Sequence, residues 1–377
     1  MDLGLSEDQE LLRDTAVRFI QDRLPLQSVR ELAETDTGAD AQYARQVAEL
    51  GWFAMLVPEK DGGGSVSGRG LVDAAIVAVE RGRYLQPSAF VPANVVAWAL
   101  AAHGNEDQRT KVLPGIVGGE TVVTWALADP SGRWEPDAGV RAEDRGDGYS
   151  LDGTKGLVQD AHLADWLLVT AGSGGALTQF LVPGDAPGLK VSPLDGLDLT
   201  RRFCTVEFAD VRLPASSVVG APRGAAPAVE RQLQIALVLS LAESVGAMDR
   251  DFEVALDYAK VRTAFGRPIG SFQAVKHLLA DTSLLLETSK ALVAAAAEAV
   301  QDEADDAAEV VSMAKAYVGD SGIELAHNCF QTFGGIGYTW EHDQHLYLRR
   351  LTADADLYGD PPWHRDRLCR LHGFWEG

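Results

Sequence analysis

Cysteine is scarce in this sequence. Cys204, Cys329 and Cys369 are the only cysteines among 377 residues, and they lie far apart. This spacing excludes a dense disulfide framework and a Cys-x-x-Cys zinc site. So few thiols are typical of a protein of the reducing cytoplasm, which is the localisation we expect.

Basic residues and long apolar runs are scarce too. The 33 Lys and Arg residues face 55 Asp and Glu residues, a net charge of −22 that repels nucleic-acid phosphates and anionic lipids. No apolar run reaches the roughly 18 residues that a membrane-spanning helix needs. The opening residues, MDLGLSEDQELLRD, are acidic where a signal peptide is basic. We therefore expect no nucleic-acid partner and no membrane association.

The composition is otherwise that of a folded globular protein, with 46% apolar and 23% charged residues. The length predicts two or three domains. Residues 1–118 have a helical pattern, which begins with a capping box formed by Ser6 and Gln9. We therefore predict an N-terminal helical domain over residues 1–118.

The sequence pattern changes from helical to β-prone in residues 119–222. Short β-prone runs such as TVVTWALA, DWLLVTA and CTVEFADVRLP are separated by Gly, Pro and Asp. Their connections are too short for crossover helices, so the sheet should be mainly antiparallel. Long helical patterns then return over residues 223–377 and predict a helix bundle. The predicted fold class is a multi-domain α+β protein with a middle antiparallel β domain between two helical domains.

Two glycine-containing segments indicate a ligand. The segment RTAFGRPIGSFQ, residues 262–273, places a cation, an aromatic ring and an amide at a junction between helices, where free backbone N–H groups meet anions. It favours a phosphate-bearing ligand. The segment QTFGGIG, residues 331–337, allows close backbone approach, and a simple glycine C-cap explains it equally well. Glu341, His342 and His345 lack a third distant ligand, so we predict no metal site.

These segments, taken in order, resemble the acyl-CoA dehydrogenase family of flavoproteins. The resemblance rests on LSEDQELLRDTAVRF, GWFAMLVPEKDGG, ALADP, LDGTK, VRTAFGRPIGSFQAVKH, QTFGGIGYT and YLRR, which together span nearly the whole chain. It implies a C-terminal four-helix bundle, a tetramer built as a dimer of dimers, and FAD that lies between domains and across the dimer contact.

The resemblance also implies cofactor-binding residues. Arg262, Phe265 and Gln273 match the residues that hold the pyrophosphate and adenosine of FAD. A guanidinium is an always-charged, bidentate partner for a pyrophosphate. Gln331, Gly334 and Gly335 match residues that reach the neighbouring subunit's FAD. Leu157 and Gln159 fall where a Trp-Ile-Thr stretch packs on the flavin ring. Ala128-Asp129-Pro130 replaces the family's Thr-Glu-Pro, so flavin contacts there should differ in detail.

The substrate half departs from the family pattern. The family uses a carboxylate to remove the α-proton of a thioester, often the Glu of a Tyr-Glu-Gly-Thr stretch, and Tyr358 stands where that Glu is expected. A tyrosine, with an ordinary pKa of about 10, is a poor base at neutral pH. The family's other base position falls on Ala236, and its Arg near the CoA arm falls on Leu237.

Three carboxylates remain as candidates for the missing base. Asp360 lies two residues beyond Tyr358 and is the best of them. Glu243 lies in the apolar pattern LVLSLAESVGAM, so we expect a buried structural carboxylate. Asp356 is expected to pair with Arg349 or Arg350 at the surface.

The leading prediction is an FAD-dependent acyl-CoA dehydrogenase-like oxidoreductase of lipid metabolism. It would remove hydrogen from Cα and Cβ of an acyl-CoA or related thioester and pass electrons to an acceptor such as electron-transfer flavoprotein. Three arrangements stay open: a self-sufficient homo-tetramer that uses Asp360, a base-lacking subunit of a hetero-tetramer with a related chain, and a non-redox flavin-binding structural subunit.

Overall fold

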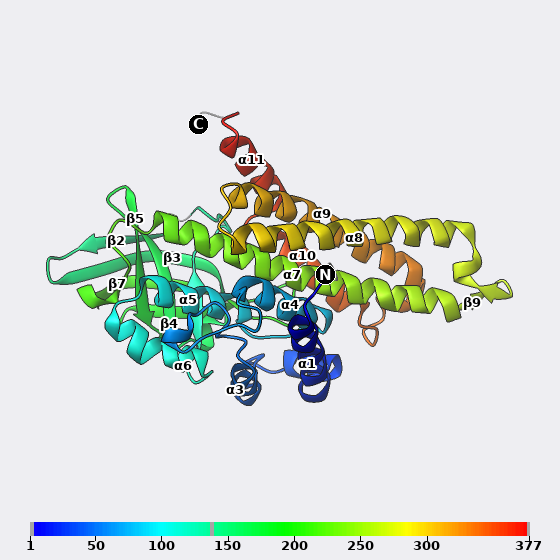
Figure 1. The fold of residues 1–377 in the computed structure, drawn as a ribbon, viewed down its shortest axis with the longest axis horizontal. Helices are drawn as coiled ribbons and strands as arrows, with labels where there is room; N and C mark the ends of the chain where they lie inside the picture. The colour runs from blue at the N-terminus through cyan, green and yellow to red at the C-terminus, as the bar shows by residue number, and fades with distance from the viewer. Residues whose placement is uncertain (1–3, 136–138, 375–377) are drawn as a thin grey trace.

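The computed structural model describes residues 4–135 and 139–374. Helices, a sheet and long helices follow one another along the chain (Figure 1). The N-terminal helices are α1 (Glu7–Arg23), α2 (Leu26–Ala33), α3 (Ala41–Glu49), α4 (Gly70–Arg83), α5 (Phe90–His103) and α6 (Leu113–Val117). The predicted capping box is confirmed at the start of α1, where the backbone N–H of Gln9 donates to Ser6 Oγ and that of Ser6 donates to Gln9 Oε1.

The middle of the chain forms one sheet. Its strands are β1 (Val123–Ala126), β2 (Val140–Asp144), β3 (Gly148–Gln159), β4 (Trp166–Ser173), β5 (Ala176–Pro183), β6 (Leu189–Leu194), β7 (Phe203–Pro214) and β8 (Val218–Val219). The order is β6-β7-β3-β2-β4-β5-β8, with β1 beside β4. Most pairs are antiparallel, as predicted, whereas β1 and β2 run parallel to β4. The sheet has its own apolar core, in which valines are the most frequent side chains.

The C-terminal helices form the long dimension of the molecule. They are α7 (Ala226–Val261), α8 (Gln273–Gln301), α9 (Ala307–Phe333), α10 (Gln344–Asp356) and α11 (Pro361–Leu371). With 36 residues, α7 is roughly 54 Å long. Figure 1 shows the sheet at one end of α7 and the hairpin β9 (Thr263–Ala264) to β10 (Arg267–Pro268) at the other. Two helical regions with a mainly antiparallel sheet between them confirm the predicted α+β fold class.

Glycines bring α4 and α7 into backbone contact. A Cβ atom at Gly82 would lie 1.9 Å from the carbonyl oxygen of Glu243, and one at Gly246 would lie 1.9 Å from that of Val79. A side chain at either position would force the two helices apart. The N-terminal and C-terminal helices consequently share one continuous apolar core.

No helix in the described part of the chain is both long enough and apolar enough to cross a membrane. The three cysteines are unbridged, and Cys204 and Cys329 are buried.

Candidate active site

A cavity of about 520 Å³ opens where the sheet meets the bundle. The segment after β1 forms one wall with residues 130–135, Leu157 of β3 forms a second, and the α10–α11 connection forms the third with Asp356, Gly359 and Asp360. The structure therefore brings together Leu157, Tyr358 and Asp360, which the sequence placed in the flavin and substrate halves of a site.

Tyr358 packs against Trp134, one of the residues that line this cavity. Its ring stacks on Trp125, with centroids 6.0 Å apart and an interplanar angle of 25°, and packs against Trp134 at 5.0 Å. The side chain is 7% exposed, and its burial raises the pKa of the phenol well above the ordinary value. The phenol stays protonated at neutral pH and is no proton acceptor. The sequence analysis missed both tryptophans, although they flank the ALADP motif.

Asp360 begins α11. Its Oδ1 accepts a hydrogen bond of 2.7 Å from the backbone N–H of Trp363, and prolines follow at the first helical positions. This is the geometry of an N-cap, which the Asp-Pro-Pro pattern predicts. Asp360 thus has a structural role, although it lies in the cavity wall beside the exposed Asp356.

Glu243 is 4% exposed and forms a buried ion pair. Arg81 of α4 donates from Nε to Glu243 Oε1 over 3.1 Å and from Nη2 to the carbonyl of Pro87 over 2.8 Å. The same guanidinium lies 4.6 Å above the ring of Phe90. Glu243 therefore joins α7 to α4 through its ion pair with Arg81.

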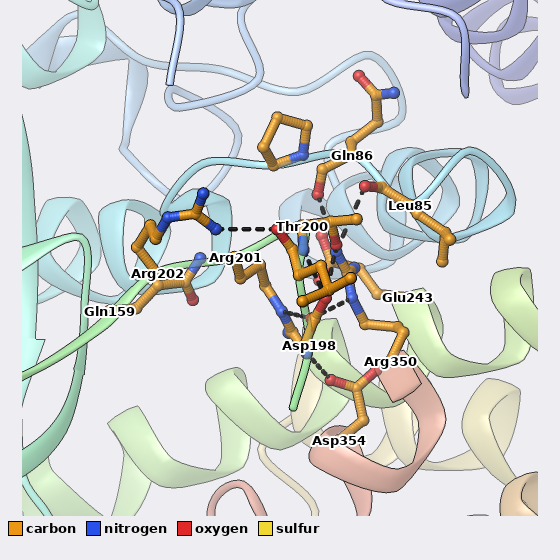
Figure 2. A network of polar contacts seen from close by, with 12 residues as sticks. Leu85, Gln86, Gln159, Asp198, Thr200, Arg201, Arg202, Glu243, Arg350 and Asp354 are labelled. Carbon is orange, nitrogen blue, oxygen red and sulfur yellow. Dashed lines mark hydrogen bonds and ion pairs between the residues drawn. The ribbon is translucent and has the colours of Figure 1, made fainter. Parts of the chain in front are cut away.

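A second buried network joins all three parts of the chain (Figure 2). Arg201 and Arg350 both donate to Asp198 Oδ2 over 2.7 Å, and Arg201 also pairs with Asp354. Desolvation raises the pKa of Asp198, but the charges of Arg350 and Arg201 outweigh it and hold that pKa well below its usual range. Asp356 was expected to pair with Arg349 or Arg350, but Arg350 turns inward to Asp198 and Arg349 donates to the carbonyl oxygen of Leu197 over 3.3 Å.

The loop of residues 128–133, which corresponds to the family's Thr-Glu-Pro segment, forms hydrogen bonds within itself. Asp129 accepts hydrogen bonds from the backbone N–H and hydroxyl of Ser131, at 2.9 and 2.7 Å, and from the N–H and guanidinium of Arg133. Desolvation raises the pKa of Asp129, yet these bonds prevail and lower it to about 2. The donors that would meet an anionic cofactor are thus already paired with a carboxylate. The cavity is lined by both polar and apolar side chains, with Trp134, Leu157 and Trp363 as its large apolar members.

The side-chain amide of Gln159 also has a hydrogen-bond partner within the chain. Its Nε2 donates to the carbonyl oxygen of Ser88 over 2.9 Å, which ties the end of β3 to the N-terminal helices. Lys155, on the same strand, is buried and donates to the carbonyl oxygen of Leu127 over 2.7 Å. The strand that faces the cavity therefore contributes the side chain of Leu157 rather than a free polar group.

The other proposed cofactor residues lie on an exposed tip. Arg262, Phe265 and Gln273 stand where α7 ends and α8 begins, and all three are exposed. Phe265 is 96% exposed and has a positive φ of 51°, a conformation unusual for an aromatic residue. An exposed aromatic ring held in this way is typical of a binding surface.

The glycine segment at the end of α9 is exposed too. Gln331 lies in the last turn of α9, and Gly334 caps the helix with a positive φ of 62°. The next residue, Gly335, is exposed, and a Cβ atom there would meet open space. The bend allows backbone N–H groups to approach a ligand closely.

Within one chain the tip is far from the cavity. Ser244 donates to Asp354 over 3.2 Å, close to the cavity residue Asp356, whereas Arg262 ends the same helix 18 residues later, roughly 27 Å away at about 1.5 Å per residue. The tip and the cavity of a single chain are therefore not parts of one site.

Comparisons with known proteins identify the family to which this fold belongs. The family model described as the acyl-CoA dehydrogenase N-terminal domain matches residues 6–120, and that of the C-terminal domain matches residues 223–365. The chain is 30% identical to the acyl-CoA dehydrogenase IpdE2 of Mycobacterium tuberculosis, over 98% of each chain.

Solved structures agree with this assignment. One chain of the ChsE4–ChsE5 complex from Mycobacterium tuberculosis superposes with a TM-score of 0.90 at 25% identity, with 100% of both chains covered. A chain described as a variant of the Tcur3481–Tcur3483 steroid ACAD superposes with a TM-score of 0.87 at 28% identity, over 98% of each chain. The chain therefore belongs to the acyl-CoA dehydrogenase family, whose members are FAD-dependent oxidoreductases.

Proposed function

We propose that this chain is a subunit of a hetero-oligomeric acyl-CoA dehydrogenase and that a related partner chain supplies the catalytic carboxylate. The assembly removes hydrogen from Cα and Cβ of an acyl-CoA thioester. Its electrons pass to an acceptor such as electron-transfer flavoprotein. The observation that carries the proposal is the position of Tyr358, which is buried between Trp125 and Trp134 where the family has its base.

Four acids in this part of the molecule support this proposal. Glu243 and Asp198 are bound to arginines, and Asp129 is bound by its own loop. Asp360 caps α11. A general base needs a carboxylate within hydrogen-bond reach of the proton that it removes, and each of these groups is held by another partner.

The tip residues support the partner role. When bound, FAD accepts hydride from the substrate. Arg262 would pair with the pyrophosphate, and Phe265 would pack against the apolar face of the dinucleotide. Gln273, Gln331 and the glycines at 334 and 335 would add amide and backbone contacts to the same cofactor in the partner chain. The 520 Å³ cavity should bind FAD more weakly than the tip does, because Ser131 and Arg133 in its wall already donate to Asp129.

Two structural relatives favour a two-chain enzyme. ChsE4–ChsE5 is described as a complex, and Tcur3481–Tcur3483 is named as a pair of chains. Each is at least 25% identical to this chain, and the superpositions cover at least 98% of it. An assembly of two related chains is consistent with a tip that is intact and a base position that holds Tyr358.

One alternative rests on a specific observation. Asp360 and Asp356 both line the 520 Å³ cavity, so a homo-oligomer that uses Asp360 as its base is the second candidate. The two proposals differ in what the isolated chain does. A self-sufficient enzyme is reduced by an acyl-CoA on its own, whereas a base-lacking subunit requires its partner.

Co-expression tests the proposal. The chain is produced alone and together with an acyl-CoA dehydrogenase-like chain from the same genome that has the Tyr-Glu-Gly-Thr glutamate. We expect a stable complex with FAD only in the pair, and flavin reduction by an acyl-CoA only in the pair. Replacing the partner's glutamate by glutamine should abolish reduction while the complex and its FAD remain. Full activity in the isolated chain would contradict the proposal.

A further inference from the structure

A second cavity lies between the N-terminal helices and the sheet. It has a volume of about 290 Å³ and shares no lining residue with the 520 Å³ cavity within the described residues. Its walls come from α3, from the start of α5 and from the start of β1. Most lining side chains are small or apolar, among them Ala44, Phe53, Ala93, Ile116, Val123 and Leu163.

One buried carboxylate lines this apolar cavity. Asp160 follows β3, is 5% exposed and has a positive φ of 51°. Its backbone N–H donates to the carbonyl of Arg202 over 2.9 Å, which fixes the turn. Burial raises the pKa of Asp160 to about 7, against the opposing charges of Arg201, Arg202 and Arg81. The family-like chemistry described above makes no use of this group.

The surroundings of Asp160 decide which ligand fits. The three arginine charges that act on it oppose an ammonium group, and the apolar walls together with the carboxyl group oppose an anion. A neutral hydroxyl group meets both conditions, because it donates to the carboxylate and accepts from the carboxylic acid. Ser88 and Thr121 line the same cavity and add hydroxyl groups.

The volume limits the size of the ligand. An apolar cavity of roughly 150 Å³ holds a benzene molecule, and this one is about 290 Å³. We propose that the cavity binds a neutral, apolar alcohol of about two fused rings, with its hydroxyl on Asp160. Ligand pockets of this kind combine apolar walls with a few convergent polar groups. This proposal is independent of the catalytic role.

Two matched probes test this site on the full chain. Indan-2-ol and indane differ by one hydroxyl group, and their binding is measured by saturation-transfer NMR. We expect saturable binding of indan-2-ol, about tenfold tighter than that of indane, as one hydrogen bond to a charged group contributes. Equal affinities, or no saturable binding of indan-2-ol, would overturn the proposal.

Three variants separate the cavity from the carboxyl group. Ala44→Leu fills the cavity from α3 and should weaken indan-2-ol at least tenfold. Asp160→Gly suits the positive φ and should reduce the preference for the alcohol to about one. Ala280→Leu, at an exposed position of α8, is the matched control and should bind as the unmodified chain does. Unchanged binding in Ala44→Leu, with the fold confirmed by circular dichroism, would place the alcohol elsewhere and refute the site.

Discussion

The phenol ring of Tyr358 stacks on the indole of Trp125, with ring centroids 6.0 Å apart and an interplanar angle of 25°. Trp134 covers another side of the same ring. Tyr358 is thus part of a buried aromatic cluster with Trp125 and Trp134. Under the proposed function, this packing is the reason that Tyr358 does not replace the catalytic carboxylate.

Replacing Tyr358 tests its role as a packing residue. Tyr358→Phe keeps the ring and should leave both the unfolding temperature and the activity of the two-chain complex unchanged. Tyr358→Ala should lower the free energy of unfolding by about 3–5 kcal/mol, because a large buried ring is lost. Thermal unfolding and flavin reduction are measured on all three proteins. A loss of activity in Tyr358→Phe with an unchanged fold would show that the phenol group takes part in the reaction.

Asp360 is expected to behave as a helix cap. Asp360→Asn preserves the capping oxygen and should keep both stability and activity in the complex. Asp360→Ala removes it and should cost about 0.5–2 kcal/mol of stability. The measurements are urea unfolding and anaerobic flavin reduction. If Asp360→Asn retains FAD but is no longer reduced by an acyl-CoA, Asp360 is the base and the alternative arrangement is correct.

Arg262 is expected to act on a cofactor held by another chain. Arg262→Ala should leave the isolated chain's unfolding temperature unchanged, since the side chain is exposed, and should reduce flavin retention in the complex at least tenfold. Lys260→Ala removes an exposed cation two residues away and serves as the control. Flavin absorbance per protein after gel filtration gives the result. Equal retention in both variants would remove Arg262 from the site.

The network around Asp198 predicts a pH response. Because its pKa in the folded state is depressed, the stabilisation from Asp198 is present above its ordinary pKa of about 4 and is lost only as the pH falls toward the folded value. Unfolding temperatures at pH 7 and pH 5 should therefore show no loss from this group.

Asp198→Asn leaves Arg201 and Arg350 without their shared carboxylate and should cost about 3–5 kcal/mol at neutral pH. Asp210→Asn removes an exposed partner of Arg212 and should have no measurable effect. Urea unfolding of both variants compares the two ion pairs. Equal stability of the two variants would show that the buried network contributes little.

Local patterns in the sequence predicted much of the fold. The 3.6-residue periodicity and breakers placed the long helices, and the Ser6 capping box marked the start of α1. The antiparallel sheet followed from its short connections, but the parallel pairing of β1 with β4 did not, because that pairing is set by tertiary contacts. The Asp-Pro-Pro pattern predicts the helix cap at Asp360, whereas its carboxylate alone suggests a base.

The partners of the buried charged residues could not be predicted from local sequence patterns. Glu243 was expected in the core, yet its partner Arg81 is 162 residues away, and Arg350 and Asp198 are 152 residues apart. Such pairs form where three parts of the chain meet, and periodicity says nothing of which charges meet there. The two tryptophans around Tyr358 belong to the same class of long-range contact.

Anaerobic titration of the purified chain with acyl-CoA thioesters, alone and after addition of the glutamate-bearing partner, tests the central claim most directly. The account predicts that the chain alone gives no substrate-dependent bleaching of flavin absorbance, whether or not FAD is supplied, and that the complex bleaches with at least one thioester. Bleaching of the isolated, FAD-loaded chain would contradict the claim that Tyr358 marks a missing base.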